Sequence, residues 1–540
     1  MKDIKRFYKH TLVITLAILG SYFLGLALVN YDFKHNNDTK ESVIDTDFGS
    51  FLAAQHAVYI NDFDNAMNFV NKIQAKNDSI DYIKNVAGFF SGNLPENAGK
   101  LKDSKDVVDM LIYDAFLIQK DDWANVYKRH DKDKSIFAAP LRIFSAAKQG
   151  KTKEAYKFID SLKTNDSWRA FMRGQVAVSN NDVDGAAKEF AKVQPDFMNI
   201  NDYLYLMSFY RENGMEKDME ILREDFLSTP TGMFVINYPD IPDWSNFKGY
   251  KNNLVFSIIQ TISHTQIMLY TDLSLMFLRF AQAISDGTNS DAINYYLGQY
   301  HFYNYGDFET FFNKINKQHP LYLSSRLSLY EKNNDFSAIN KITRKNPLFL
   351  PAIQISVKEN IRFGNKRAAL SILNRALKQI YLSDVGARFF LKQRAYVYSM
   401  FGDFDRAQHD LHKIKEIDLK ITPDLMFLQA KIWTAQNKNL DDAYEYAMNL
   451  IKNNTSDVYA WDLVSRIVAK RESIDNALEI MESIGETGVN LSLVFDTLGD
   501  LYAQKGEKER ALRAYYQALD LSDDCLVVVP FVEKKIRKLK

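Results

Sequence analysis

Apolar residues recur at helical spacing along most of the chain, and the pattern is clearest near the C-terminal end. Large and small apolar residues alternate over residues 495–502 and again over residues 511–518. Each run fits one face of an α-helix, in which apolar positions recur every three to four residues. Gly506 lies between the two runs, where a tight turn favours a residue without a Cβ atom. The sequence therefore predicts two helices joined by a short turn.

The small residue of the second predicted helix recurs at a nearly constant interval. The interval is 36 residues from Ala407 to Ala443, and it is 34 residues from Ala443 to Ala477 and from Ala477 to Ala511. Ala369 begins this run. A repeat of this length is typical of solenoids, in which each helix pair buries its apolar face against its neighbours. We expect an all-α fold, an α-solenoid formed by a superhelical array of helix pairs.

The N-terminal half repeats less regularly, although units of the same kind are recognisable over residues 54–70, 150–162 and 174–195. Their small residues and inter-helix turns match the pattern, whereas their lengths vary. We expect a degenerate N-terminal array over residues 48–227 and a more regular C-terminal array over residues 291–525.

Residues 228–290 interrupt the repeats. Five Pro and Gly residues between positions 228 and 253 exclude a continuous helix there. Two apolar stretches follow, Leu254–Tyr270 and Leu273–Ile284. The first contains four polar side chains that would lack partners in lipid, namely Gln260, Ser263, His264 and Gln266. We therefore expect buried helices at the junction of the two arrays, not a second membrane span.

The N-terminus has the pattern of a membrane anchor. Four basic residues within the first nine positions precede an apolar run from Leu12 to Val29. About 20 apolar residues are needed to cross a bilayer as a helix, and a cleavable signal peptide has a shorter apolar stretch that ends in small residues. The sequence at residues 27–30 offers no such cleavage site, so an uncleaved anchor is favoured over a cleaved signal.

This anchor sets the expected location of the rest of the chain. The basic flank should stay in the cytoplasm, which places residues 32–540 on the other side of the membrane. We expect a cytoplasmic flank and transmembrane helix over residues 1–31, with the lipid bilayer contacted through residues 12–29, and a polar tether over residues 32–47. In a Gram-negative bacterium the protein would be a single-pass inner-membrane protein with its bulk in the periplasm.

The charge balance and composition exclude several classes of protein. The 68 Lys and Arg residues equal the 68 Asp and Glu residues, whereas a nucleic-acid binder normally carries a basic excess. Only 22 Gly and 11 Pro residues argue against a turn-rich all-β fold. The basic tail over residues 526–540 is expected to end a capping helix, since cations suit a helix C-terminus. Binding of an acidic surface by this tail is the alternative.

No arrangement of residues predicts an active site. Cys525 is the only cysteine, so neither an intramolecular disulfide nor a Cys-x-x-Cys pair is possible. Phosphate-binding glycine loops and a His-Glu-x-x-His motif are absent from the sequence. His409 and His412 share a helix face, but no third metal ligand accompanies them, so a solvated face is expected. We expect a protein that is not an enzyme, with no cofactor, no metal and no small-molecule substrate.

The helix-pair pattern resembles the tetratricopeptide repeat (TPR), a helix–turn–helix unit of about 34 residues. The residues that carry the resemblance in the last unit are Phe495, Leu498, Gly499, Tyr502, Gly506, Ala511, Tyr515 and Ala518. The resemblance extends over residues 48–525. Segments 439–443 and 498–502, together with the N-terminal anchor and the central loop, are similar to long membrane-anchored TPR proteins of alphaproteobacteria. The resemblance implies a concave surface, lined by the first helix of each unit, that holds a peptide or protein partner.

Side chains four residues apart lie on one face of a helix, and such pairs recur on four successive first helices. The candidate groove residues are Lys392 and Tyr396, Phe427 and Lys431, Asp462 and Arg466, and Asp496 and Asp500. The basic and aromatic members would hold an acidic or C-terminal peptide, and the two last aspartates would repel one. The alternative is that all eight are ordinary solvated groups.

These patterns favour a membrane-anchored TPR scaffold or adaptor that mediates protein–protein interaction in the bacterial cell envelope. The alternative is a non-catalytic subunit of a cell-envelope or polysaccharide synthesis complex, in which another chain supplies catalysis. The sequence does not specify the partner.

Overall fold

The structure is a computed structural model of the chain. It describes residues 46–133, 135, 138–227, 229, 231–232, 248–265, 271–287, 289–304, 307–380, 386–417 and 422–540. Every regular element within these ranges is a helix, so the all-α expectation is confirmed for them. The anchor expected over residues 12–29 lies outside the described residues. Inside them, no helix combines the length and the apolar character needed to cross a membrane.

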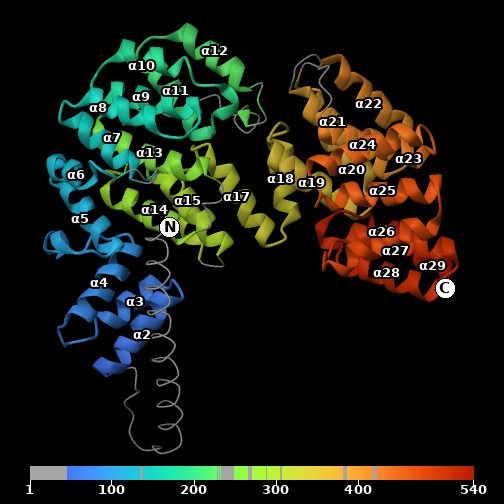
Figure 1. The fold of residues 1–540 in the computed structure, drawn as a ribbon, viewed down its shortest axis with the longest axis horizontal. Helices are drawn as coiled ribbons and strands as arrows, with labels where there is room; N and C mark the ends of the chain where they lie inside the picture. Colours follow the sequence, from blue (N-terminus) through green and yellow to red (C-terminus); the bar gives the residue numbers. More distant parts are fainter. Residues whose placement is uncertain are drawn as a thin grey trace, which may run out of the picture. The chain divides into compact units, whose positions relative to one another are not determined.

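Contacts divide the described residues into two compact units. The first lies within Met1–Val193 and Asp243–Leu321, and the second lies within Gln194–Pro242 and Tyr322–Lys540. The helices of the first unit (Figure 1) are α2 (Asp47–Tyr59), α3 (Phe63–Val70), α4 (Asp78–Phe90), η2 (Ala98–Asp103), α5 (Val107–Gln119), α6 (Trp123–His130), α7 (Ala139–Lys148), α8 (Thr152–Ser161), α9 (Asp166–Ser179), α10 (Val183–Phe190), α13 (Tyr250–His264), α14 (Asp272–Ile284), α15 (Ser290–Tyr303) and α16 (Glu309–Phe312).

The second unit contains the regular repeats. Its helices are η3 (Pro195–Phe197), α11 (Ile200–Glu212), α12 (Glu216–Leu227), α17 (Leu321–Lys332), α18 (Phe336–Lys345), α19 (Leu350–Arg362), α20 (Lys366–Leu377), α21 (Ala387–Met400), α22 (Phe404–Ile417), α23 (Pro423–Gln436), α24 (Leu440–Asn453), α25 (Val458–Arg471), α26 (Ile474–Glu486), α27 (Ser492–Lys505), α28 (Lys508–Asp520), η7 (Ser522–Asp524) and α29 (Val529–Leu539). From α19 to α28, each helix packs against the next along the chain.

A left-handed residue turns the chain between the two helices of a pair. Gly506, between α27 and α28, has φ +87°, which confirms the turn predicted there. In other pairs an Asn or Asp takes this conformation, and the following Asp accepts a hydrogen bond from a backbone N–H at the start of the second helix. These two-residue turns are Asn61–Asp62, Asp121–Asp122, Asn181–Asp182 and Asn334–Asp335. The caps satisfy N–H groups that have no partner inside the helix.

The alanines that defined the repeat register lie at helix contacts. Ala369, Ala407, Ala443, Ala477 and Ala511 have no exposed surface, which confirms the predicted register. Glycines serve the same purpose in some first helices, because a Cβ atom there would overlap the aromatic ring of the second helix. The glycine–aromatic pairs are Gly174–Phe190, Gly298–Phe312 and Gly499–Tyr515.

The inner helices of the N-terminal array are covered by the chain's own helices α13 and α14. Helix α13 packs on α7 and α9, and α14 packs on α4 and α5, which are first helices of successive units (Figure 1). The apolar stretches after the central loop are therefore buried helices, as expected. The expectation that they lie at a junction of two arrays is corrected, because they fill the inner side of the N-terminal array.

Polar side chains fix α13 in this position. Asn253 donates to the Ser179 hydroxyl at 3.0 Å, and the Ser257 hydroxyl donates to Gln175 Oε1 at 2.8 Å. Phe256 stacks on Phe171 with ring centroids 5.9 Å apart. Asn253, Ser257 and Gln175 are fully buried, so these bonds satisfy groups that water cannot reach.

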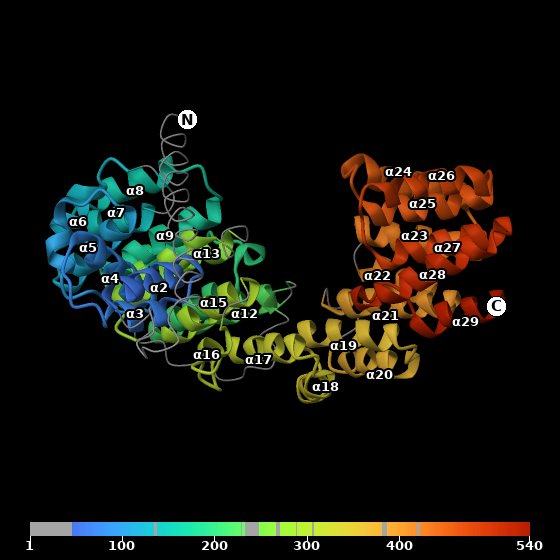
Figure 2. The same ribbon diagram turned by 90° about the horizontal axis from the view of Figure 1, so that it is seen from below.

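The C-terminal tail folds as the expected capping helix, α29, and the tail contributes to two hydrophobic cores of the C-terminal array. Val532 and Ile536 join the core of α24–α28, whereas Val528 joins the core built by α19–α23. The Phe531 ring meets Phe401, which follows α21, edge-on at 5.7 Å. Figure 2 shows α29 beside α28, with α21 close by. Cys525 lies at a half-buried position just before this helix, with its thiol 3.3 Å from Glu359 Oε1.

Candidate functional site

The eight predicted groove residues lie on α21, α23, α25 and α27, the first helices of four successive pairs. Neighbouring members of this series contact each other directly: α21 contacts α23, α23 contacts α25, and α25 contacts α27. Their shared face is therefore continuous. Three of the eight residues, Lys431, Arg466 and Asp500, line one pocket with a volume of about 190 Å³. The pocket also includes Lys470 and Thr497, which the sequence analysis did not single out.

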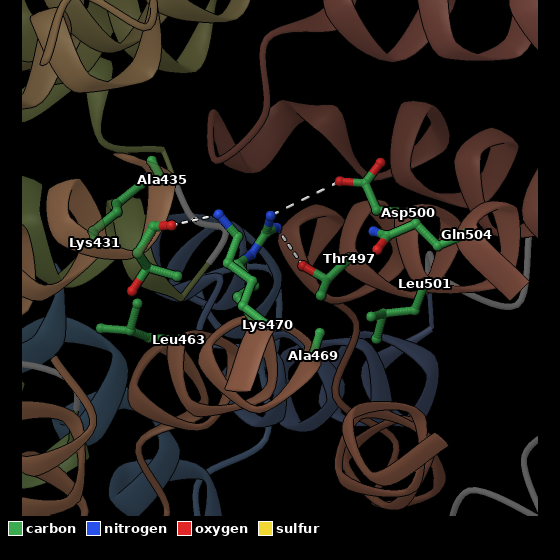
Figure 3. A pocket seen from close by; sticks show the side chains of 11 residues that line it. Lys431, Ala435, Leu463, Ala469, Lys470, Thr497, Asp500, Leu501 and Gln504 are labelled. Atoms are coloured by element: carbon green, nitrogen blue, oxygen red, sulfur yellow. Dashed lines mark hydrogen bonds and ion pairs between the residues drawn. The ribbon is translucent and has the colours of Figure 1, made fainter. Parts of the chain in front are cut away.

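Figure 3 shows the pocket walls. Lys431 and Ala435 lie on one side, Asp500 and Gln504 lie on the other, and Lys470 projects between them. Because these side chains come from α23, α25 and α27, three helix pairs must stack in register to form the site. Consecutive repeats thus create a surface that no single pair contains.

Arg466 is the structural centre of the pocket. Its Nε donates to Asp462 Oδ2 at 3.0 Å, its Nη2 donates to the Thr497 hydroxyl, and its Nη1 lies 3.8 Å from Asp500 Oδ2. Although burial disfavours the charged guanidinium, the charges of Asp462, Asp500 and Asp496 outweigh this effect and raise the pKa of Arg466. Arg466 therefore stays charged and holds the two neighbouring helices together.

Lys431 has a different environment. Its Nζ lies 3.2 Å from Met400 Sδ and 5.0 Å from the centroid of the Tyr396 ring. Burial lowers the pKa of Lys431 to about 8, and the positive charge of Arg466 adds to this shift. Among the described residues, no carboxylate lies within ion-pair distance of Lys431. This ammonium group lies over an aromatic ring and a sulfur atom, and the charge of Asp462, which raises the pKa, only partly offsets the lowering by burial and Arg466.

Lys470 supplies a second cation at the rim of the pocket. Its Nζ donates to the backbone carbonyl of Thr434. Burial and the charge of Arg466 both lower the pKa of Lys470. Lys470 is four residues after Arg466 and thus on the same helix face, so the rule that selected the other pairs would also have found it.

Two of the eight predicted groove residues, Lys392 and Phe427, make other contacts outside the pocket. Lys392 pairs with Asp424 on the next first helix and does not line the pocket. The Phe427 side chain packs, partly buried, against the core of α24–α28. These two residues stabilise contacts between neighbouring helix pairs.

The acidic end of the predicted groove is not open. Lys535 of α29 donates to Asp496 Oδ1 at 2.7 Å and to Asp500 Oδ2 at 2.9 Å. The Tyr515 hydroxyl donates to Asp500 Oδ1 at 2.8 Å. The expectation that these two aspartates would repel an acidic ligand is corrected, because Lys535 and Arg466 balance their charges. Sequence reasoning missed Lys535 because the approach of α29 to α27 is a tertiary contact.

The described residues contain no group of three or more His, Cys, Asp or Glu side chains arranged to hold a metal ion. His409 and His412 are both exposed on α22, and His412 Nε2 lies 3.4 Å from Glu416 Oε1. The pocket itself combines the cations Lys431, Arg466 and Lys470 with the Thr497 hydroxyl and the Asp500 carboxylate.

No protein-family model matches the sequence, and no curated protein matches it. Among solved structures, the chain is similar to a tetratricopeptide repeat protein from Parabacteroides merdae, with 12% identity over 55% of this chain and 96% of that chain and a TM-score of 0.31. It is also similar to the APC/C hetero-tetramer Cut9–Hcn1, with 12% identity over 92% of this chain and 84% of that chain and a TM-score of 0.31. A third similar structure is yeast Tom70, with 13% identity over 82% of this chain and 96% of that chain and a TM-score of 0.30. Likenesses at this level carry no functional argument. The described residues form an all-helical repeat protein with a pocket, lined by three cations, on the first helices of the C-terminal array.

Proposed function

We propose that the protein is a membrane-anchored scaffold that binds acidic segments of partner proteins on the first helices of its C-terminal array. The observation that carries the proposal is the pair of lysines in the pocket, Lys431 and Lys470, neither of which has a carboxylate partner among the described residues. The scaffold role is supported by the stacked helix pairs, whose continuous inner surface suits an extended partner.

The positive charges of Lys431 and Lys470 explain why we expect an acidic ligand. A partly buried ammonium that has no ion-pair partner among the described residues is disfavoured, and burial together with the charge of Arg466 lowers the pKa of Lys431. A carboxylate from a partner that enters the pocket would restore the missing charge and form charge-assisted hydrogen bonds with both lysines. Because Arg466 already contacts Asp462 and Thr497, it would position the site more than it would bind the ligand.

The N-terminal array is less suited to this role. Its first helices α4, α5, α7 and α9 are covered by α13 and α14 of the same chain. Binding of an extended partner on that side would require two helices with a buried polar interface to move away. We therefore assign partner binding to the C-terminal array.

The sequence supports a location for the scaffold. The basic flank and the apolar run over residues 12–29 support a single-pass anchor, with the arrays outside the cytoplasm. In this arrangement the scaffold gathers proteins of the cell envelope close to the membrane. A reporter that is active only in the cytoplasm, fused after Lys540, is expected to stay inactive, and its activity would contradict this topology.

Photo-crosslinking in intact membranes tests the binding site. A photoreactive residue replaces Ala435, which is exposed and lines the pocket. We expect it to capture a segment rich in Asp or Glu, and the double variant Lys431→Met, Lys470→Met should lose that crosslink. The matched control is Lys438→Met, Lys452→Met, which removes two exposed lysines outside the pocket.

Stability separates loss of binding from loss of fold. Replacement of Lys431 and Lys470 by Met removes no ion pair, only the hydrogen bond of Lys470 to the Thr434 carbonyl and the contact of Lys431 with the Tyr396 ring, so the melting temperature should change little. Charge reversal at Arg466 is a poor test, because it would leave the buried Asp462 without its cation at a cost of about 3–5 kcal/mol. Unchanged crosslinking in the Lys431 and Lys470 variant would overturn the proposed site.

A further inference from the structure

Helix α2 opens the N-terminal array and buries only one of its faces. Ala54 and Ala57, with 0% and 4% exposure, point into the core. Phe48 and Tyr59 are 56% and 61% exposed, and Leu52 between them is half-buried. At 3.6 residues per turn, positions 48, 52 and 59 fall within about 40° of one another around the helix axis. These three residues, with Gln55 between Leu52 and Tyr59 on the same side of the helix, form a largely apolar stripe on the outer side of α2.

Helices α2 and α29 differ in the polarity of their outer faces. At the C-terminal end, α29 covers the last helix pair and exposes charged side chains, including Glu533, Lys534 and Arg537. The terminal unit of a repeat array normally needs such a polar outer face to remain soluble. At the start of the N-terminal array, the stripe on α2 and the 54% exposed Ile60 take the place of that polar face.

The position of α2 along the chain places this stripe within reach of the expected anchor. The apolar run ends at Val29 and α2 begins at Asp47, and even a fully extended chain of 17 residues spans only about 60 Å. An anchor over residues 12–29 would therefore hold the start of α2 within about 60 Å of the bilayer. Phe and Tyr side chains on one face of a helix suit the boundary between lipid head groups and acyl chains.

We propose that α2 lies on the membrane, with Phe48, Leu52 and Tyr59 in the interfacial layer of the bilayer that holds the anchor. The inference rests on the proposed anchor. Helix α2 contains no Lys or Arg, so apolar burial drives the contact and attraction to anionic lipid does not. Its Asp47 carboxylate accepts hydrogen bonds from the backbone N–H groups of Gln74 and Ala75, at 3.1 and 3.0 Å, and is already satisfied by protein.

Site-directed spin labelling of the full chain in phosphatidylcholine nanodiscs tests this contact. In a Cys525→Ser background, the label is attached through Phe48→Cys or, separately, Tyr59→Cys. We expect both labels to collide more often with oxygen, which concentrates in lipid, than with a water-soluble nickel chelate. The control label, at Val107→Cys, is 51% exposed at the start of α5 and should show the opposite preference. Addition of phosphatidylserine should leave the values unchanged.

Three results would overturn the proposal. Preference for the nickel chelate at position 48, in protein that co-purifies with nanodiscs, would show that the stripe faces water although the anchor is inserted. Dipolar broadening between labels at position 48 would show that a second copy of the chain covers the stripe. Failure of the protein to co-purify with nanodiscs would remove the anchor itself, and the lipid contact with it.

Discussion

At the scale of single residues, the close approach of paired helices depends on positions that cannot carry a side chain. A Cβ atom at Gly499 would overlap the Tyr515 ring, and one at Gly174 would overlap Phe190. Both glycines belong to recognisable repeat units, and the sequence pattern that indicated the repeat includes Gly499. It did not show which ring each of them contacts, since this depends on the angle at which the two helices cross.

Replacement of Gly499 by Ala should therefore destabilise the C-terminal unit, by about 1–3 kcal/mol from overpacking. The matched control is Gly485→Ala in α26, where a Cβ atom would meet nothing within 4 Å. This control should be neutral or stabilising by up to about 1 kcal/mol, because Ala favours the helix. Urea unfolding measures both values. Equal stability of the two variants would contradict the proposed packing.

A buried histidine makes the stability of the first unit depend on pH. His130 Nε2 lies 2.8 Å from Asp114 Oδ2, and Asp133 lies 4.0 Å from the other ring nitrogen. Burial disfavours the charged ring, but hydrogen bonds and charges of the two aspartates outweigh it and raise the pKa of His130 to about 9. Arg129 shares Asp114, with its Nε 2.6 Å from Oδ1.

Because the folded pKa is raised above the ordinary value of 6.5, the stabilisation is fully present below pH 6.5 and is lost as the pH rises through about 9. At pH 6, His130→Gln should lower the free energy of unfolding, by up to about 3 kcal/mol. The difference from the unmodified protein should shrink toward pH 10. The control is His409→Gln, at an exposed position of α22. A difference that is constant with pH would show that His130 is not charged in the fold.

At the scale of elements, helix pairs and their turns were predictable because their signals are local. The Asp121–Asp122 turn, the Gly506 turn and the buried alanines all follow from residues within one repeat. The placement of α13 was not predictable in the same way. Its partners α7 and α9 lie about 70 to 110 residues earlier in the chain, and no local pattern records that contact.

Local sequence patterns likewise predicted only part of the pocket. The four-residue spacing on first helices found Lys431, Arg466 and Asp500, which the structure brings together. It did not find Lys535, because α29 follows the last repeat and its contact with α27 has no counterpart in the repeat pattern. Charges contributed by a capping element have to be read from the structure.

The contact of α29 with α27 yields a prediction at this scale. Lys535→Gln should leave Asp496 without its cation and weaken the docking of α29, by about 1 kcal/mol for a partly exposed pair. Backbone amides of α27 and α29 should then exchange hydrogen faster, and this effect should diminish in high salt. The control is Lys538→Gln, an exposed position of the same helix. Equal exchange in both variants would show that the ion pairs do not hold the helix.

At the scale of the whole molecule, the two units use the same helix pairs for different purposes. The first unit covers its own first helices with α13 and α14, so its inner side serves the core. The second unit leaves a pocket on its first helices, with Lys431 and Lys470 on its walls. A repeat array that is partly filled by its own chain restricts partner binding to the surface that remains. We therefore expect partner binding on the C-terminal array.

The most direct test of this assignment is the affinity of the full protein for two ten-residue peptides that differ only in charge. One peptide carries four Glu residues, and the other carries Gln at the same positions. We predict at least tenfold tighter binding of the Glu peptide at pH 7, and loss of that preference in Lys431→Met, Lys470→Met but not in Lys438→Met, Lys452→Met. Equal affinity for both peptides, or an unchanged preference in the pocket variant, would contradict the account.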